Sequence, residues 1–139
     1  MRGIPWREKK KMVKVMVVDD SREVILSIAQ GLKEIDDSYE VIPAESGRKC
    51  LEILETEIPD AILLDIMMPE MSGWEVYDKI RDNPKWEDIP ILFLTARTDR
   101  IAENAGKFLG DDYIEKPFDP MDLKNRIDKA IERRKKQSG

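Results

Sequence analysis

The stretch KVMVVDDS at residues 14–21 joins an uninterrupted apolar run to two adjacent carboxylates. Successive apolar residues, several of them β-branched, are typical of a strand that is buried on both faces of a sheet. Ser21 can cap a helix, and apolar residues follow it at helical spacing, at Val24, Ile25, Ile28, Ala29 and Leu32. The stretch therefore predicts a buried strand that turns directly into an amphipathic helix, with Asp19 and Asp20 at the turn.

The same pattern of strand, polar residue and helix repeats along the chain. Further strands are predicted at residues 39–42, 61–64, 91–94 and 112–115. Ser46, Ser72 and Asp99 precede the next three helices, and the last helix has Asp119 as its cap and Pro120 at its first position. This alternation predicts an α/β fold, a doubly wound parallel sheet of five strands with five helices on its two faces.

Polar side chains stand where four of these strands end. They are Asp19 and Asp20, Asp65, Thr95 and Lys116. We expect them to meet, because an open doubly wound sheet binds its ligands beyond the carboxyl ends of its strands.

The chemistry of this set favours phosphoryl transfer. Three carboxylates in one crevice raise each other's pKa unless a cation intervenes, and an oxygen-only site with several carboxylates suits Mg²⁺. Lys116 and the Thr95 hydroxyl could each hold a phosphoryl oxygen. The set therefore predicts transfer of a phosphoryl group onto Asp65, which would be the nucleophile.

Length and composition exclude several other classes. The chain has 139 residues, which suits one domain, and it has no histidine and a single cysteine, Cys50. Zinc sites of His and Cys, disulfides within the chain and Ser-His or Cys-His catalytic pairs are therefore excluded. The sequence shows neither a membrane span nor a secretory signal, so we expect a soluble, cytoplasmic protein that does not insert into a membrane.

Charge is distributed unevenly along the chain. Residues 1–14 and 124–139 each carry a net charge of +5, and the segment between them carries −15. We expect a folded domain at residues 13–133, between a basic extension at 1–12 and a basic tail at 134–139. Basic runs of this kind are typically solvated tails or the end of a helix, and the acidic middle argues against nucleic-acid binding.

Four motifs resemble one known family. They are the stretches at residues 17–21, 63–69, 94–96 and 112–118, which read VVDDS, LLDIMMP, LTA and DYIEKPF. Together and in this order they are similar to the response-regulator receiver domain of two-component signalling, in its stand-alone, chemotaxis-type form. The resemblance implies a flavodoxin-like sheet with the strand order 2-1-3-4-5.

The resemblance also implies roles for the carboxylates. Asp65 would accept a phosphoryl group from a phosphohistidine of a sensor histidine kinase or phosphotransfer protein. Asp20, Asp19 and Asp65 would bind Mg²⁺, with the backbone carbonyl of Met67 completing the metal shell. The protein would be a phosphoacceptor rather than an enzyme.

The remaining implied roles concern the response to phosphorylation. Lys116 would pair with Asp65 and then with its phosphate, and a cis Lys116–Pro117 bond would aim the ammonium into the crevice. Thr95 and Tyr113 would act as the switch, altering the surface of the fourth helix, fifth strand and fifth helix. That surface would signal to a downstream protein effector, with the chain as a monomer or a phosphorylation-dependent dimer.

Two features depart from the family pattern. The stretch at residues 109–112 lacks the usual alanine, so the fourth helix and its following loop would be one residue shorter. Met67 and Arg97, two residues beyond Asp65 and Thr95, are not the polar and acidic pair of the fast chemotaxis type. Our hypothesis is that the apolar Met67 side chain hinders attack by water and prolongs the life of the aspartyl phosphate.

Three alternatives remain open at this point. A small Mg²⁺-dependent phosphatase that works through an aspartyl phosphate would need an acid where Met67 stands. A flavin or nucleotide binder would fit a doubly wound sheet, but no glycine-rich phosphate motif occurs. A receiver-like scaffold that is never phosphorylated would not need the complete polar set.

Overall fold

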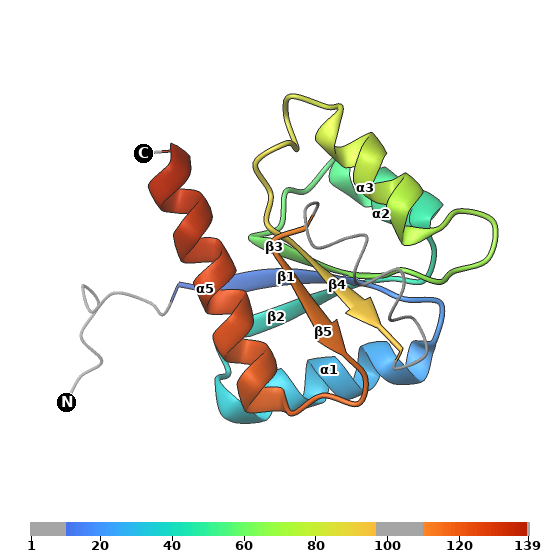
Figure 1. The fold of residues 1–139 in the computed structure, drawn as a ribbon. Coiled ribbons are helices and arrows are strands. Elements are labelled where there is room, and N and C mark those ends of the chain that lie inside the picture. The colour runs from blue at the N-terminus through green and yellow to red at the C-terminus, as the bar shows by residue number, and fades with distance from the viewer. Residues whose placement is uncertain (1–10, 97–109, 139) are drawn as a thin grey trace.

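A computed structural model describes residues 11–96 and 110–138, which form a parallel sheet covered by helices on both faces (Figure 1). The strands are β1 (Val13–Val18), β2 (Tyr39–Ala44), β3 (Ala61–Asp65), β4 (Ile91–Thr95) and β5 (Asp112–Glu115). Their order in the sheet is β2-β1-β3-β4-β5, and every neighbouring pair is parallel. The predicted α/β class and strand order are confirmed.

Helices cover the sheet in two pairs. The described helices are α1 (Arg22–Ile35), α2 (Gly47–Leu54), α3 (Gly73–Arg81) and α5 (Pro120–Ser138). The pair α1 and α5 packs on one face, and α2 and α3 pack on the other (Figure 1). The helix predicted after Asp99 and the departures noted at Arg97 and Leu109 lie outside the described residues.

The central strands are buried on both sides, as their composition predicts. In β1, Met16 and Val18 pack toward α2 and α3, whereas Val15 and Val17 pack toward α1 and α5, and all four have 0% exposure. Alternate side chains of a strand point to opposite faces, so a strand covered on both sides needs an unbroken apolar run. Cys50 lies in the α2 and α3 layer with 0% exposure, and burial raises the pKa of its thiol to about 12, so it fills the core as an uncharged thiol.

The helix caps predicted at Ser21, Ser46, Ser72 and Asp119 are present. The side chains of Ser21, Ser46 and Ser72 each accept a backbone N–H from the first turn of the following helix, and Glu75 completes a reciprocal capping box with Ser72. Asp119 accepts the N–H of Asp122 at the start of α5. These bonds set where each helix begins relative to the strand before it.

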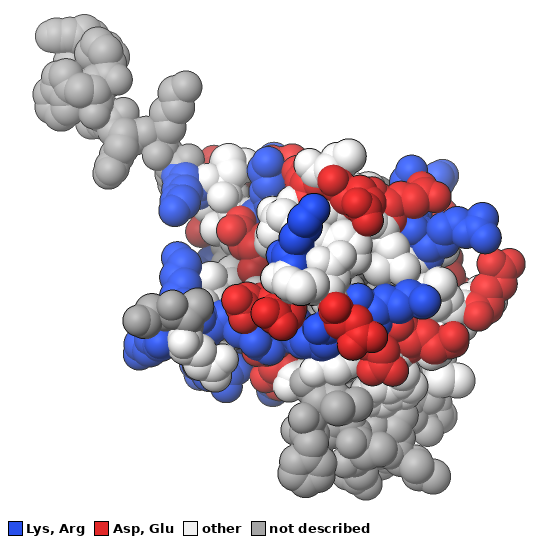
Figure 2. Space-filling view, turned by 90° about the horizontal axis from the view of Figure 1, so that it is seen from above, with Lys and Arg blue, Asp and Glu red and all other residues white. Residues whose placement is uncertain are grey.

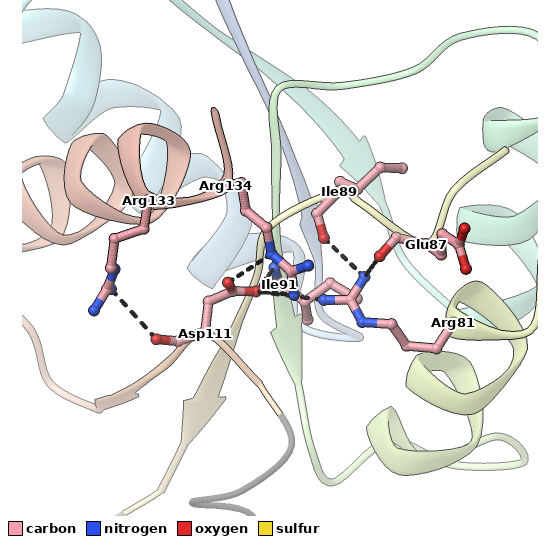
Figure 3. Close-up of polar contacts among 7 residues, drawn as sticks. All are labelled: Arg81, Glu87, Ile89, Ile91, Asp111, Arg133 and Arg134. Atoms are coloured by element: carbon pink, nitrogen blue, oxygen red, sulfur yellow. Dashed lines mark hydrogen bonds and ion pairs between the residues drawn. The ribbon is translucent and has the colours of Figure 1, made fainter. Parts of the chain in front are cut away.

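The basic run near the carboxyl end is the end of a helix, one of the two interpretations that the sequence left open, because α5 continues to Ser138. Asp111 anchors this part of the helix, since its carboxylate accepts bonds from Arg134, at 2.9 Å from Nε, and from Arg81 in α3, at 3.3 Å (Figure 3). The backbone carbonyl of Asp111 also accepts a bond from Arg133 at 3.4 Å. The basic residues are thus part of a helix that is fastened to the start of β5.

Many basic side chains of α5 are paired with acids in the same region. The ion pairs are Lys124 with Asp128, Arg126 with Asp112 and Asp122, Arg134 with Asp111, and Lys136 with Glu132. Figure 2 likewise shows acidic and basic side chains close together across the described part of one face. These pairs offset part of the positive charge of this helix. Among the described helices, none has the length and apolar composition needed to cross a bilayer.

Candidate functional site

The carboxylates predicted from the strand ends lie together. Asp19 and Asp20 follow β1, and Asp65 ends β3, the strand paired with β1. One carboxylate oxygen from each of the three lies within 4.8 Å of the others. Asp19 and Asp65 are 1% and 5% exposed, whereas Asp20 is exposed. The cluster therefore has two buried charges and one that faces solvent.

Lys116 brings a positive charge to this cluster from the far edge of the sheet. Its Nζ lies 2.8 Å from Oδ2 of Asp19 and 3.5 Å from Oδ1 of Asp65. The Lys116–Pro117 peptide bond is cis, as predicted. The other Asp19 oxygen, Oδ1, accepts the backbone N–H of Ser21 at 2.9 Å. Asp19 is thus held by two donors, and the ammonium lies between the two buried carboxylates.

One ammonium does not neutralise three carboxylates. The pKa of Asp65 is raised to about 6, chiefly by burial, with the charges of Asp19 and Asp20 also raising it and Lys116 opposing them. Burial would lower the pKa of Lys116, but its hydrogen bond to Asp19 and the charges of Asp65 and Asp19 outweigh this effect and raise it. Lys116 therefore stays protonated, and the site keeps an excess of negative charge that favours a further cation.

The donor set fits Mg²⁺. Hard divalent cations take carboxylate oxygens, and Mg²⁺ usually retains several waters beside one or two carboxylates. Asp19, Asp20 and Asp65 supply such oxygens, and the exposure of Asp20 leaves one side open to water. Met67 follows Asp65 by two residues, and its side chain is 63% exposed. The part assigned to its backbone carbonyl stays a prediction.

The predicted switch residues lie on the neighbouring strands. Leu94 pairs with Asp65 in the sheet, and Thr95 comes directly after it with 0% exposure. Within the described part of the chain, the Thr95 Oγ1 atom has no hydrogen-bond partner. Tyr113 is half-buried and stacks on Phe93, with the ring centroids 5.1 Å apart. Thr95 therefore has an uncommitted hydroxyl beside the strand that carries Asp65.

Gly73 is a positioning residue whose importance the sequence did not show. A Cβ atom at Gly73 would lie 2.4 Å from the backbone oxygen of Asp65 and 2.8 Å from the Cα of Ile66. The Gly73 N–H also donates to the Ile66 carbonyl at 2.8 Å. In the sequence this glycine follows the capping Ser72 directly, at the start of the predicted helix. A glycine beside a capping serine was the available signal, but it did not reveal which strand the helix approaches.

Comparison with known proteins identifies the class to which this fold and site belong. A family model described as the response regulator receiver domain matches residues 15–128, so the chain belongs to the response-regulator receiver family. Among curated proteins, it is 39% identical over 122 residues to the alkaline phosphatase synthesis transcriptional regulatory protein PhoP of Bacillus subtilis. It is 43% identical over 114 residues to a Vibrio cholerae protein named "Probable cyclic di-GMP phosphodiesterase".

Solved structures support the same membership. The chemotaxis protein CheY4 of Vibrio cholerae is 31% identical with a TM-score of 0.76, and the alignment covers 86% of this chain and 98% of that one. A response regulator receiver domain protein from Clostridium thermocellum is 31% identical with a TM-score of 0.77, and the alignment covers 89% of this chain and 98% of that one.

The curated relatives are longer proteins. The match to the Bacillus regulator covers 87% of this chain and 49% of that protein, and the match to the Vibrio protein covers 81% and 25%. The likeness therefore concerns the receiver domain of each relative.

Proposed function

We propose that this receiver domain accepts a phosphoryl group on Asp65 from a phosphohistidine of a sensor histidine kinase or phosphotransfer protein. The observation that carries the proposal is the position of the buried Asp65 carboxylate, 3.5 Å from the Lys116 ammonium and beside the carboxylates of Asp19 and Asp20. Phosphoryl transfer depends mainly on positioning and on neutralising charge, and this arrangement serves both needs.

The transfer exchanges one bond to phosphorus for another. A carboxylate oxygen of Asp65 forms the new P–O bond while the P–N bond to the imidazole breaks, and the imidazole nitrogen keeps the electron pair. Asp19 and Asp20, together with Asp65 and the Met67 carbonyl, would hold Mg²⁺, which when bound neutralises phosphoryl oxygens. Lys116 would hold a phosphoryl oxygen with its ammonium.

The response would begin at Thr95. Its buried hydroxyl is free of hydrogen bonds to other described residues, so it can donate to a phosphoryl oxygen on Asp65. Tyr113 would move with Thr95 and change the surface that includes β5 and α5. We propose that this surface, together with the fourth helix expected from the sequence, contacts a downstream protein effector. The chain would bind no nucleic acid directly and would be a monomer or a phosphorylation-dependent dimer.

Intact-mass spectrometry after incubation with acetyl phosphate tests the proposal. We expect one added phosphoryl group that requires both Mg²⁺ and Asp65, and therefore no adduct in Asp65→Asn. Asp60→Asn is a matched control, because Asp60 is an exposed aspartate near the start of β3, at the other end of that strand. This variant should be labelled like the native chain.

Failure of the native chain to form either a phosphoryl or a beryllofluoride adduct would overturn the proposal. That result would favour the alternative of a receiver-like scaffold that is not phosphorylated. Rapid release of inorganic phosphate with repeated turnover would instead favour the phosphatase alternative, which the apolar Met67 side chain does not support.

A further inference from the structure

Three aromatic rings from three elements form a closed triangle on the α2 and α3 face of the sheet. They belong to Trp74 in α3, Phe93 in β4 and Tyr113 in β5. The centroid distances are 4.8 Å between Trp74 and Phe93, 5.1 Å between Phe93 and Tyr113, and 6.4 Å between Trp74 and Tyr113. All three lie in the range in which aromatic pairs attract one another beyond simple burial.

Phe93 is the fixed member of this triangle. It has 0% exposure, and the Tyr77 ring lies 5.5 Å away from it, centroid to centroid. A Cβ atom at Gly110 would come within 2.7 Å of two carbons of the Phe93 ring, so the backbone before β5 passes directly over it. Trp74 and Tyr113 are only half-buried. Any change in the triangle is therefore a change in the position of Trp74 or Tyr113.

The triangle adjoins the proposed phosphorylation switch through the pleat of the sheet. Phe93 and Thr95 are two residues apart in β4, so their side chains point to the same face. Tyr113 pairs with Phe93 in the neighbouring strand and lies on that face as well. A movement of Thr95 would therefore take place next to the aromatic triangle. Tyr113 is the residue of the triangle that lies on β5, the neighbouring edge strand.

We propose that Trp74 is the positioning residue for Tyr113, and that its indole holds the tyrosine ring on the inward side of β5. Phe93 supplies the surface on which the tyrosine stacks, and Trp74 closes the side that faces α3. Removing the indole leaves Tyr113 with one aromatic neighbour of the triangle instead of two. The inward position should then lose population by roughly two- to tenfold, which is the size of one aromatic contact.

This inference deepens the proposed function, since the meaning of the Tyr113 position rests on its role in the response. It adds α3 to the elements that respond. Trp74 is in the first turn of α3, and that helix begins where Gly73 approaches the backbone of Asp65. The first turn of α3 would thus lie against the backbone of Asp65 at Gly73 and against the Tyr113 ring at Trp74.

Fluorine NMR of the full chain labelled with 3-fluorotyrosine tests the inference. The chain has three tyrosines, so Tyr113→Phe identifies the Tyr113 resonance by its loss. The measured quantities are the chemical shift of that resonance and its relaxation by a soluble paramagnetic agent, which reports exposure of the ring. We expect Trp74→Leu to move the shift and to raise the paramagnetic relaxation about twofold or more, in metal-free buffer without a phosphodonor. Trp74→Phe, which keeps a smaller ring, should give values between those of the native chain and Trp74→Leu.

Trp86→Leu is the matched control, because Trp86 is a 5% exposed member of the same hydrophobic cluster but is not part of the triangle. It should leave the Tyr113 resonance at its native position. A native Tyr113 resonance and relaxation in folded Trp74→Leu would overturn the inference. If Trp74→Leu does not fold, the test uses Trp74→Phe instead. A native Tyr113 resonance and native paramagnetic relaxation in that variant would then overturn the inference.

Adding Mg²⁺ and beryllofluoride separates this inference from the proposed function. Bound beryllofluoride gives a fluorine signal of its own, which should be absent in Asp65→Asn. Lack of that signal in the native chain would contradict phosphorylation of Asp65, whereas the Trp74 effect in metal-free buffer is measured independently of it.

Discussion

The ammonium of Lys116 lies closer to Asp19 than to the proposed phosphoacceptor, with Nζ 2.8 Å from Asp19 Oδ2 and 3.5 Å from Asp65 Oδ1. The carboxylate that it contacts most closely is therefore one that would bind the metal. In the absence of a divalent cation, Lys116 partly compensates the charge of the cluster. A metal ion and the ammonium would have to share the oxygens of Asp19.

Removing this ammonium should strengthen Mg²⁺ binding. In Lys116→Met we expect the affinity for Mg²⁺, measured by calorimetric titration, to rise by about threefold or more, because a competing charge is lost. The same variant should be phosphorylated more slowly than the native chain. Lys124→Met, which breaks an ion pair with Asp128 in α5, is the control and should bind Mg²⁺ as the native chain does. Weaker binding in Lys116→Met would show that the lysine orders the site rather than competing for it.

The charge of Asp65 should reduce stability in metal-free solution. Because folding raises the pKa of this carboxyl to about 6, the folded chain binds the proton more tightly than the unfolded chain. The group therefore favours folding below its unfolded pKa, and that contribution is lost as the pH rises through the folded pKa.

Asp65→Asn should accordingly be more stable than the native chain near neutral pH, by on the order of 2 kcal/mol in free energy of unfolding. The difference should shrink toward about pH 4, where the native carboxyl is protonated in the folded state. Urea titrations at both pH values, in the presence of a chelator, measure it. A stability difference that does not depend on pH would contradict this explanation. Adding Mg²⁺ should stabilise the native chain more than Asp65→Asn.

Met67 should govern the lifetime of the aspartyl phosphate. Its side chain is 63% exposed two residues beyond Asp65, where an apolar group can hinder the approach of water. Met67→Asn should lose its phosphoryl group faster after the phosphodonor is removed, as followed by intact-mass spectrometry. Met121→Asn replaces another exposed methionine, 49% exposed in α5, and should decay at the native rate. Equal rates in Met67→Asn and the native chain would refute the hypothesis.

Gly73 should tolerate no side chain. A methyl group there would meet the Asp65 carbonyl oxygen at 2.4 Å, which is backbone and cannot turn aside. We expect Gly73→Ala to lower the free energy of unfolding by roughly 2 kcal/mol or more and to slow phosphorylation. Gly31→Ala is the control, because its Cβ would meet only the side chain of Pro120, at 3.1 Å, and alanine favours a helix. The interpretation fails if Gly73→Ala has native stability and is phosphorylated at the native rate.

The carboxylate of Asp111 should be a main attachment of α5 to the sheet. It accepts bonds from Arg81, Arg134 and the backbone N–H of Ile91 (Figure 3). Asp111→Ala leaves these donors without their acceptor and should cost about 2–4 kcal/mol, measured by thermal or urea unfolding. Asp122→Ala breaks an exposed pair with Arg126 and should cost less than about 1 kcal/mol. Equal losses in the two variants would argue against a special role for Asp111.

Hydrophobic patterns and capping residues identified the helices and strands, because each of these signals lies within a short stretch of sequence. The unbroken apolar run before Asp19 marked β1, and Ser72 with Glu75 marked the start of α3. The strand at residues 39–42 was predicted too short, since β2 extends to Ala44 through Pro43. Proline is permitted there because β2 lies at the edge of the sheet, where one side of the strand needs no hydrogen-bond partner.

The residues of the functional site could be predicted from the sequence for a different reason. Parallel strands bring their carboxyl ends to one edge, so polar residues at strand ends such as Asp19, Asp65 and Lys116 had to be neighbours once the α/β alternation was recognised. The resemblance to receiver domains then assigned each of them a role. Neither step indicated that Lys116 would lie nearer to Asp19 than to Asp65, because that depends on side-chain geometry across three strands.

Sequence patterns were enough to predict the α/β class, the helix caps before α1, α2, α3 and α5, and the polar residues at the strand ends, because these depend on hydrophobic period and on local hydrogen bonding. The contacts between separate elements depend on how the helices and strands pack. Only packing brings Gly73 against the backbone of Asp65, closes the ring triangle of Trp74, Phe93 and Tyr113, and fastens Arg134 to Asp111. Such contacts join residues of different elements, and their distances follow from how the helices pack on the sheet rather than from any local pattern.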